Sequence, residues 1–450
     1  MPARRALVAL ALLVALGLGA CTGSSGKHGA SSTSTTAASK PVRIGVWTAP
    51  DPKAATYGGV GVRELVYPQL FKATPAGRWA PSLVKAGTDK TDSGATSARF
   101  RLRPAKWSDG SPITAADLRR SIDGRFVSAV DDPTRDGTIV VHFFRPLPGW
   151  RRLWSGLDTV TPPADGVYGG PYKVQTVTPG LETVLVANAT YFGSPPAISE
   201  VHLVLTPDAE IAARLLERGD LDVIAPPAFT GRTARLERIK GAHVIEGNAA
   251  KGGWTAAFVA NPTRLDLAQR RFLFHYANGP RFTDVLLHDE AASLGPATSA
   301  DAATPEFKTT PAFALPDESA PAGVLLHAMQ RTAHKAGFDF DVRAADFDRV
   351  LGSYAAADYD VLFRLEPTLP AVCWACRYAT VDATLAQAAD SGDAGAARSL
   401  RAELVDQAYD LPLWREVPVA AVRDGLDGVT ENGFDVNGPA WNVAKWHWTR

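Results

Sequence analysis

The feature that most constrains the fold is an alternation of strand-like and helix-like segments along residues 42–421. Strand-like runs such as 138–144 are rich in β-branched residues, whereas segments 208–218 and 323–335 contain good helix formers. Strands that alternate with helices predict α/β lobes with mixed sheets. Neither a repeat of 20–50 residues nor a heptad run is present, so a solenoid or a coiled coil is not expected.

Two short motifs predict local structure within this pattern. Thr114 precedes a helical segment as its cap, and Asp117 at the third helical position completes a capping box. Pro179-Gly180 separates two β-like runs, 172–177 and 183–187, which is typical of a β-hairpin. Both motifs stabilise the fold and carry no chemistry of their own.

The first twenty residues form a separate signal. Arg4 and Arg5 precede an apolar run over 6–20, which is typical of a secretory signal peptide and is too short to span a bilayer comfortably. A plain cleaved signal or an uncleaved anchor would share this pattern. The sequence Leu18-Gly19-Ala20-Cys21 resembles the bacterial lipobox, and this resemblance implies acylation of Cys21.

Residues 21–40 are expected to be a flexible tether behind the lipidated Cys21. They are almost all Ser, Thr, Ala and Gly, a composition that buries too little apolar surface to fold. The protein is therefore predicted to be exported and held at the outer face of the bacterial cell membrane by its lipid anchor alone.

The chain without its signal peptide is nearly neutral. Lys and Arg number 47, as do Asp and Glu, and removal of Arg4 and Arg5 leaves 45 against 47, or −2. A net charge this small argues against a nucleic-acid partner. The residues beyond 40 are numerous enough for two or more packed units of about 100–200 residues each.

Two cysteines, Cys373 and Cys376, remain once Cys21 is assigned to lipid. Their C-x-x-C spacing favours a disulfide in an oxidising exterior. A redox motif is less favoured because the flanking residues do not resemble a thioredoxin unit. Zinc would need two further ligands, and no second Cys pair is present, so we expect no metal site and no cofactor.

Several stretches in order along residues 41–450 resemble the extracellular solute-binding proteins, family 5, that serve peptide, nickel and related importers. One such stretch would be a weak signal, whereas the shared order and spacing are specific. These stretches are Lys106–Asp117, Gly169–Val174, Asn188–Gly193, Glu217–Asp222, Lys335–Gly337 with Asp358–Asp360, and Leu411–Trp414.

The resemblance implies a two-lobed fold like that of periplasmic binding proteins (type II, cluster C-like), with an interlobe cleft and a small extra domain. A monomer that binds a small-molecule or peptide ligand and docks on ABC importer permease subunits is expected. The implied ranges are 1–20 for the signal peptide, 21–40 for the tether, 41–68 with 166–256 and 424–450 for lobe one, 69–165 for the small domain, and 257–423 for lobe two.

The resemblance also implies where ligand-contacting residues lie. The loop after the first strand offers Tyr57, the crossover into lobe two offers Trp254, and the later loop region offers Glu366, Trp374 and Arg377. Peptide-binding members carry an Asp-containing motif for the peptide's amino group, and here Glu366 stands in its place. A closed ring between the two flanking cysteines would stiffen the loop that presents Trp374.

Two other functions share these sequence features. A cell-surface enzyme is one, since Ser82-Leu83-Val84-Lys85 matches the S-x-x-K pattern of penicillin-interacting enzymes. The S-D-N and K-T-G partners of that pattern are missing, so no catalytic residue is predicted. A sensor or an orphan binding protein with the same fold is the other.

Overall fold

The structure of the protein is a computed structural model. Of its two units, residues 1–38 and residues 39–450, only the second contains described residues. The structure describes residues 40–47, 49–52, 61–122, 126–156, 159–206, 208–229, 231–247, 253–276, 284, 287, 290–294, 304–315, 322–344, 359–367, 385, 388, 393–435 and 437–449.

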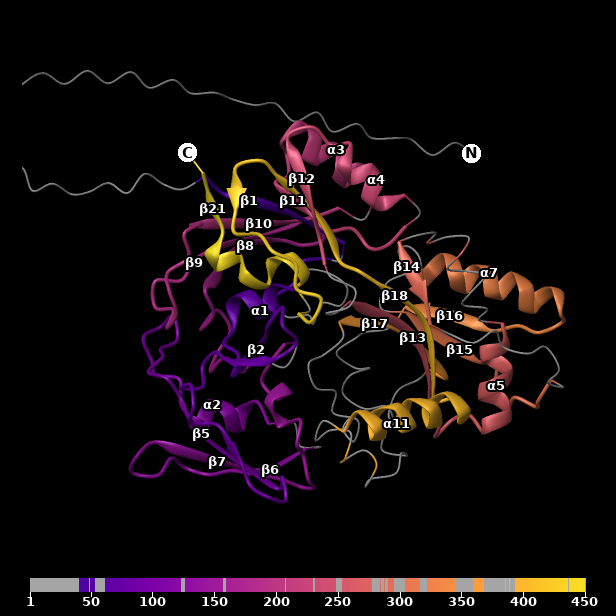
Figure 1. The fold of residues 1–450 in the computed structure, drawn as a ribbon, viewed down its shortest axis with the longest axis horizontal. Helices are drawn as coiled ribbons and strands as arrows, with labels where there is room; N and C mark the ends of the chain where they lie inside the picture. Colours follow the sequence, from indigo (N-terminus) through magenta and orange to yellow (C-terminus); the bar gives the residue numbers. More distant parts are fainter. Residues whose placement is uncertain are drawn as a thin grey trace, which may run out of the picture. The chain divides into compact units, whose positions relative to one another are not determined.

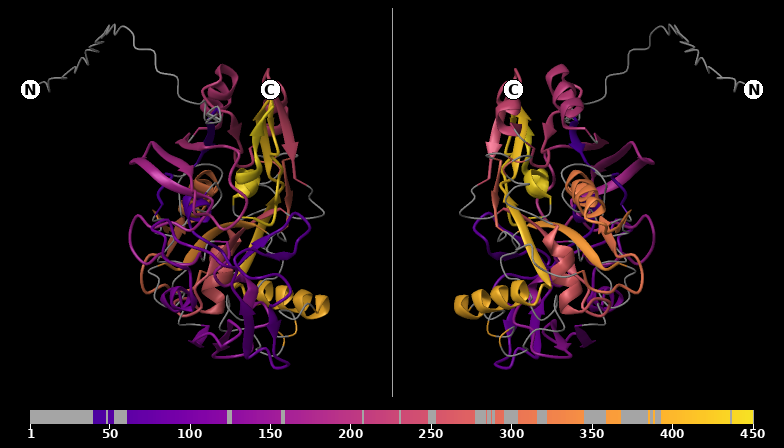
Figure 2. Two further views of the ribbon diagram at one scale, coloured as in Figure 1. Left: turned by 90° about the vertical axis from the view of Figure 1, so that its left-hand side faces the viewer. Right: turned by 90° about the vertical axis from the view of Figure 1, so that its right-hand side faces the viewer.

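A mixed sheet of seven strands is formed from the beginning, the middle and the end of the chain, in the order β12-β19-β11-β1-β10-β9-β8. Its centre is parallel, because β1 pairs with both β10 and β11, and its flanks are antiparallel. In Figure 2 the yellow C-terminal strands lie beside the magenta and pink strands from the middle of the chain. The strands are β1 (Val42–Val46), β8 (Tyr172–Thr178), β9 (Glu182–Ala187), β10 (Glu200–Leu205), β11 (Val223–Ile224), β12 (Ala242–Glu246) and β19 (Val419–Arg423).

Short helices and a pair of two-residue strands, β20 and β21, accompany this sheet. Asp208 caps the start of α3, and Gly219 ends it in the left-handed conformation. The hairpin β8–β9 is confirmed, with Gly180 at its turn. The accompanying elements are α1 (Val62–Val66), α3 (Ala209–Arg218), α4 (Arg232–Glu237), the 3₁₀ helix η2 (Gly438–Lys445), and the strands β20 (Leu426–Asp427) and β21 (His447–Trp448).

A mixed sheet of six strands is the second large layer, in the order β14-β18-β13-β17-β15-β16. In Figure 1 its strands and the helices α5, α7 and α11 lie together, apart from β1 and β8–β12. Its elements are β13 (Trp254–Ala260), α5 (Leu267–His275), β14 (Ala291–Ser293), β15 (Ala312–Leu315), α7 (Ala322–Lys335), β16 (Asp341–Ala344), β17 (Val361–Pro367), α11 (Ala394–Asp406) and β18 (Asp410–Glu416).

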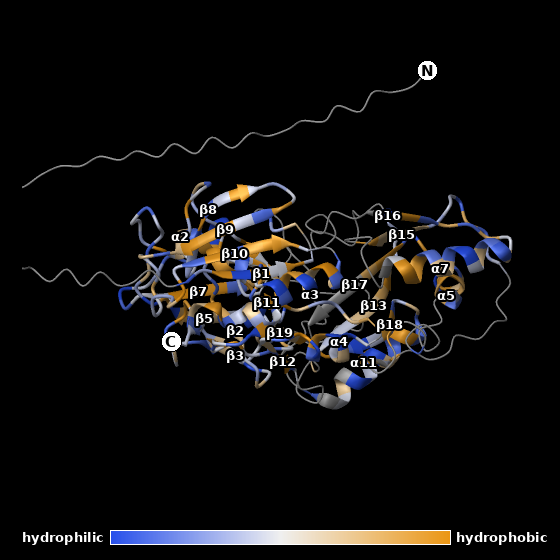
Figure 3. Ribbon diagram, turned by 90° about the horizontal axis from the view of Figure 1, so that it is seen from above, coloured by the Kyte–Doolittle hydropathy of each residue, from blue (hydrophilic) through white to orange (hydrophobic). Residues whose placement is uncertain are grey.

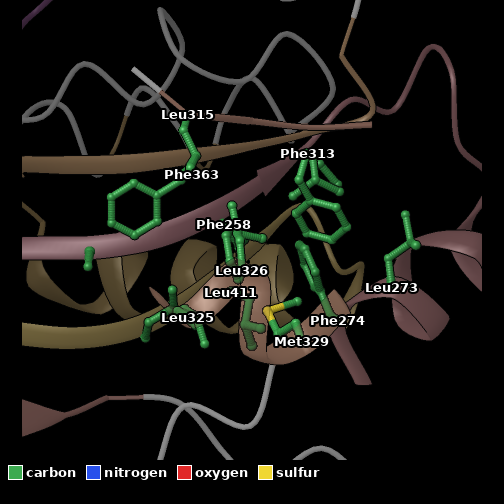
Figure 4. Close-up of a cluster of buried hydrophobic side chains, with 14 of the residues drawn as sticks. Phe258, Leu273, Phe274, Phe313, Leu315, Leu325, Leu326, Met329, Phe363 and Leu411 are labelled. Atoms are coloured by element: carbon green, nitrogen blue, oxygen red, sulfur yellow. The ribbon is translucent and has the colours of Figure 1, made fainter. Parts of the chain in front are cut away.

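Aromatic and aliphatic side chains fill the core of this second layer. Phe258 meets Phe313 and Phe363 edge-on, with ring centroids 5.3 and 5.9 Å apart. Leu325 and Met329 from α7 pack against the same cluster (Figure 4). Hydropathy follows this packing, because strands such as β10 are hydrophobic whereas α3 carries long hydrophilic stretches (Figure 3).

A small sheet of four strands, in the order β4-β5-β7-β6, has its own core around Trp107 and Trp150. The predicted capping box is present at α2, where Thr114 accepts from the backbone of Ala116 and Asp117 accepts from the backbone of Thr114. The elements are β2 (Phe71–Ala73), β3 (Trp79–Pro81), β4 (Lys90–Thr91), β5 (Ser97–Arg101), α2 (Ala115–Arg120), β6 (Val127–Val130), β7 (Thr138–Phe143) and the 3₁₀ helix η1 (Trp150–Arg152).

The predicted lobe boundaries stay predictions, because sheet membership alone does not define a domain. The six-stranded sheet begins with Trp254, two residues before the predicted boundary at 256. β19 lies in the seven-stranded sheet although it precedes the predicted boundary at 423. Within the part of the chain that the structure describes, we find no helix that is long and apolar enough to cross a membrane.

Candidate ligand-binding site

A pocket of about 450 Å³, including the space open to solvent, lies where chain segments pass between the two large sheets. It receives residues from both sheets, because Gly45 belongs to β1 whereas Trp254 and Glu416 belong to β13 and β18. Four prolines make part of its wall rigid: Pro226 and Pro227 after β11, Pro418 between β18 and β19, and Pro439 in η2. The lining residues are Gly45, Trp47, Ala225, Pro226, Pro227, Arg232, Trp254, Glu416, Pro418, Val419, Asn437, Gly438 and Pro439.

Trp254 is the predicted ligand-contacting residue that the structure places at this pocket. It is the first residue of β13, and 7% of its surface is exposed. Its indole Nε1–H has no acceptor among the described residues. A buried donor without a partner is costly, so this N–H group is suited to bind an acceptor that enters from outside. Its role in ligand binding stays a prediction.

Trp47 is a second indole in the pocket wall, and our sequence reasoning did not identify it. Its Nε1–H donates to the carbonyl of Ala225 over 2.6 Å, which fixes the ring against the segment after β11. Trp47 directly follows β1, and its side chain is buried. The position after the first strand was a usable signal, because the family resemblance places ligand groups in the loop that begins there.

Arg232 is the most deeply buried charge in the pocket wall, with 1% of its side chain exposed. Its Nε lies 3.1 Å from Oε2 of Glu290, whose side chain is 8% exposed. The other guanidinium nitrogens donate to the carbonyls of Pro226 and Val417 over 3.1 and 3.0 Å. Thr233 adds a backbone N–H bond of 2.8 Å and a hydroxyl bond of 3.0 Å to the same carboxylate.

This ion pair links the two large sheets. Arg232 opens α4, which packs against β12 and β19 of the seven-stranded sheet, whereas Glu290 directly precedes β14 of the six-stranded sheet. Val417 lies between β18 and β19, where the chain passes from one sheet to the other. Arg232 therefore binds a group on each sheet and the segment that connects them.

Glu416 and Glu431 are two further carboxyl groups at the pocket. Glu416 ends β18 with 4% of its surface exposed, and burial raises its pKa, while the charge of Arg232 and the indole N–H of Trp414 lower it. Burial raises the pKa of Glu431 to about 8, against the opposing effects of the Asn432 amide and the Arg232 charge. Both effects follow from the cost of removing a carboxylate from water.

Glu431 lies behind the pocket wall at Gly438. A β-carbon built on Gly438 would be 3.8 Å from Oε2 of Glu431, so little separates the carboxyl group from the pocket. The two carboxylate oxygens have no hydrogen-bond partner at standard distance and angle among the described residues. Such a buried acid is neutral at pH 7 because its pKa is above 7.

The remaining predicted residues are not brought to the site by the described part of the structure. The backbone of Glu366 pairs with that of Thr255, one residue beyond Trp254, and its side chain lies outside the description. Cys21 and the predicted ligand and disulfide residues Tyr57, Cys373, Trp374, Cys376 and Arg377 lie outside the described residues. Among the described residues, no group of three or more His, Cys, Asp or Glu side chains is arranged to hold a metal ion.

Residues 155–287 match the family model of bacterial extracellular solute-binding proteins, family 5 Middle. This stretch of the chain is therefore similar to the middle region of family 5 solute-binding proteins. This confirms the family predicted from the sequence, and the matched region contains Arg232 and Trp254 of the pocket wall.

Curated relatives match between 40% and 50% of this chain. LpqW of Mycobacterium tuberculosis, a probable monoacyl phosphatidylinositol tetramannoside-binding protein, is 25% identical over 218 residues, which cover 40% of this chain and 34% of LpqW. Protein XP55 of Streptomyces lividans is 28% identical over 259 residues, which cover 50% of this chain and 46% of XP55. The chain therefore matches less than half of the length of either relative.

Solved structures match nearly the whole chain at low identity. The binding protein AgaA of A. tumefaciens R10, solved with agropinic acid, has a TM-score of 0.71 at 16% identity and covers 91% of this chain and 99% of its own. DppA of Helicobacter pylori, solved with the peptide STSA, has a TM-score of 0.68 at 13% identity, over 91% of this chain and 98% of its own. This likeness confirms the predicted two-lobed periplasmic-binding-protein fold.

Proposed function

We propose that this protein captures a solute in the pocket between its two large sheets and delivers it to an ABC importer. The observation that carries the proposal is the composition of the pocket, since both sheets and the connecting segment at Pro418 contribute to one wall. A ligand held there touches both sheets at once, so it favours the arrangement in which they are close.

The finer parts of the proposal come from the sequence. We infer a peptide or peptide-like ligand, a monomeric protein without enzymatic activity, and a lipid on Cys21 that keeps the protein close to its permease. Support comes from the lipobox-like residues 18–21, the tether over 22–40 and the family model. The tether lets the folded part reach a permease without fixing its orientation.

Native mass spectrometry of the protein purified from its own host tests capture directly. We expect a small co-purifying solute, which exchange into unfolding buffer releases, and a matching rise in melting temperature when that solute is added back. Protein that is free of cargo, and whose melting temperature no peptide, metal chelate or sugar changes, would contradict ligand capture.

Replacement of Cys21 by Ser tests the anchor separately. The variant should move from the membrane fraction to the medium and keep the ligand affinity of the wild type, because Cys21 lies outside the folding part. A variant that stays in the membrane fraction would contradict the lipid anchor and leave capture untouched.

A further inference from the structure

The pocket wall and the residues directly behind it hold more buried carboxyl groups than cations. Arg232 and Glu416 line it, Glu290 binds Arg232, and Glu431 lies behind Gly438. The positive charge of Arg232 is balanced by Glu290, with an Nε–Oε2 distance of 3.1 Å. Among the described residues, neither Glu416 nor Glu431 has a cationic nitrogen within the 4.0 Å of an ion pair. A cation that enters the pocket would therefore meet a carboxyl group that still lacks a charged partner.

A second observation is independent of these charges. Trp254 is buried and lines the pocket, and its Nε1–H has no acceptor among the described residues. The strand register places Trp254 directly opposite Glu416. Directly paired residues of adjacent strands project from the same face of the sheet, with β-carbons about 4.5–5.5 Å apart. The free indole donor and the carboxyl group are therefore neighbours in one wall.

The rest of the wall suits a cation better than an anion. Pro226, Pro227, Pro418 and Pro439 have no backbone N–H, so this part of the wall offers no amide donors to an anionic group. The indole rings of Trp47 and Trp254 offer faces on which a cationic group is attracted.

We propose that the pocket takes a ligand with a protonated amine or guanidinium group that binds Glu416, beside an oxygen atom that accepts the hydrogen bond of Trp254 Nε1–H. This inference rests on the proposed function and names the chemical class of its solute. Because burial raises the pKa of Glu416, a cation beside it would also favour the charged form of that group.

The test uses three small amides that differ only at one end: 3-aminopropanamide is cationic, butanamide is neutral and succinamate is anionic. The full-length protein is labelled with ¹⁵N in its indole groups, and the signal that disappears in Trp254→Phe is assigned to Trp254. We expect 3-aminopropanamide to shift this signal saturably and with higher affinity than the other two amides.

Two variants decide the role of the carboxyl group. Glu416→Gln should weaken the binding of 3-aminopropanamide by about tenfold to a hundredfold, the range of a hydrogen bond to a charged group. Glu246→Gln removes the same charge from an exposed position on β12 and should leave the affinity unchanged.

The outcomes separate this inference from solute capture itself. Tighter binding of succinamate or butanamide than of 3-aminopropanamide would contradict the preference for a cation without contradicting solute capture. Equal affinities of Glu416→Gln and Glu246→Gln for 3-aminopropanamide would have the same meaning. A Trp254 signal that none of the three amides shifts would overturn the inference, whereas capture is judged by the cargo that co-purifies. If Glu416→Gln failed to fold, Trp254→Phe still tests the oxygen contact, because loss of the N–H alone should weaken amide binding severalfold.

Discussion

The buried carboxyl group of Glu431 predicts how the stability of the protein changes with pH. The pKa of this group is about 8 in the folded protein, against an ordinary value of 4.5. Between these two values the folded state keeps a proton that the unfolded state has lost. The unfolded state binds fewer protons there, so the free energy of unfolding falls as the pH rises.

The magnitude follows from the width of that window. The difference of 3.5 between 8 and 4.5, at about 1.36 kcal/mol per pKa unit, corresponds to about 5 kcal/mol. This contribution is complete below pH 4.5 and is lost as the pH rises to about 8. It is large beside the roughly 5–15 kcal/mol of total stability that is usual for a folded domain.

Urea unfolding between pH 5 and pH 8.5 measures the effect in the wild type and in Glu431→Gln. The amide of Gln cannot ionise, so the variant should lose about 4 kcal/mol less than the wild type over this range. Burial also raises the pKa values of Glu416 and Asp435, and these groups remain in both proteins. Glu246→Gln serves as the exposed control. Equal pH slopes in the wild type and in Glu431→Gln would refute the reasoning.

Three further predictions concern the interior and the unassigned cysteines. Glu290→Gln leaves Arg232 buried without its counter-charge and should lower the free energy of unfolding in urea by about 3–5 kcal/mol, whereas a loss below about 1 kcal/mol would show that the pair is not buried in solution. Thr114→Ala removes the cap of α2 and should cost about 1 kcal/mol by the same measurement, with Thr114→Ser as the control that retains the bond. Mass spectrometry after alkylation should find Cys373 and Cys376 protected in the exported protein, and modification of both thiols would contradict the disulfide predicted from their spacing.

Features set by neighbouring residues could be predicted from the sequence. The capping box needs only Thr114 and Asp117, and the turn of the hairpin needs only Pro179-Gly180. Each feature therefore depends on residues that are at most three positions apart in the sequence. Order along the chain then identified the family and, through it, the fold.

The pocket could be predicted only in part. Trp254 was predicted because the resemblance places ligand groups at the crossover, which is a property of chain order. Arg232 and Glu416 were missed because a single Arg or Glu in a sequence is most often a solvated surface charge. Their importance comes from burial and from Glu290, a partner 58 residues beyond Arg232. Residues 225–227 carried a usable signal for the pocket wall, because two consecutive prolines, Pro226 and Pro227, follow soon after β11 and prevent the strand from continuing.

The position of β19 has a consequence for the order in which the chain can fold. This strand comes from the last part of the sequence and yet pairs with β11 on one side and β12 on the other. Until it emerges during synthesis, both neighbours have an open edge, and contacts between residues so far apart form slowly. The seven-stranded sheet therefore cannot close while the C-terminal part of the chain is still being made.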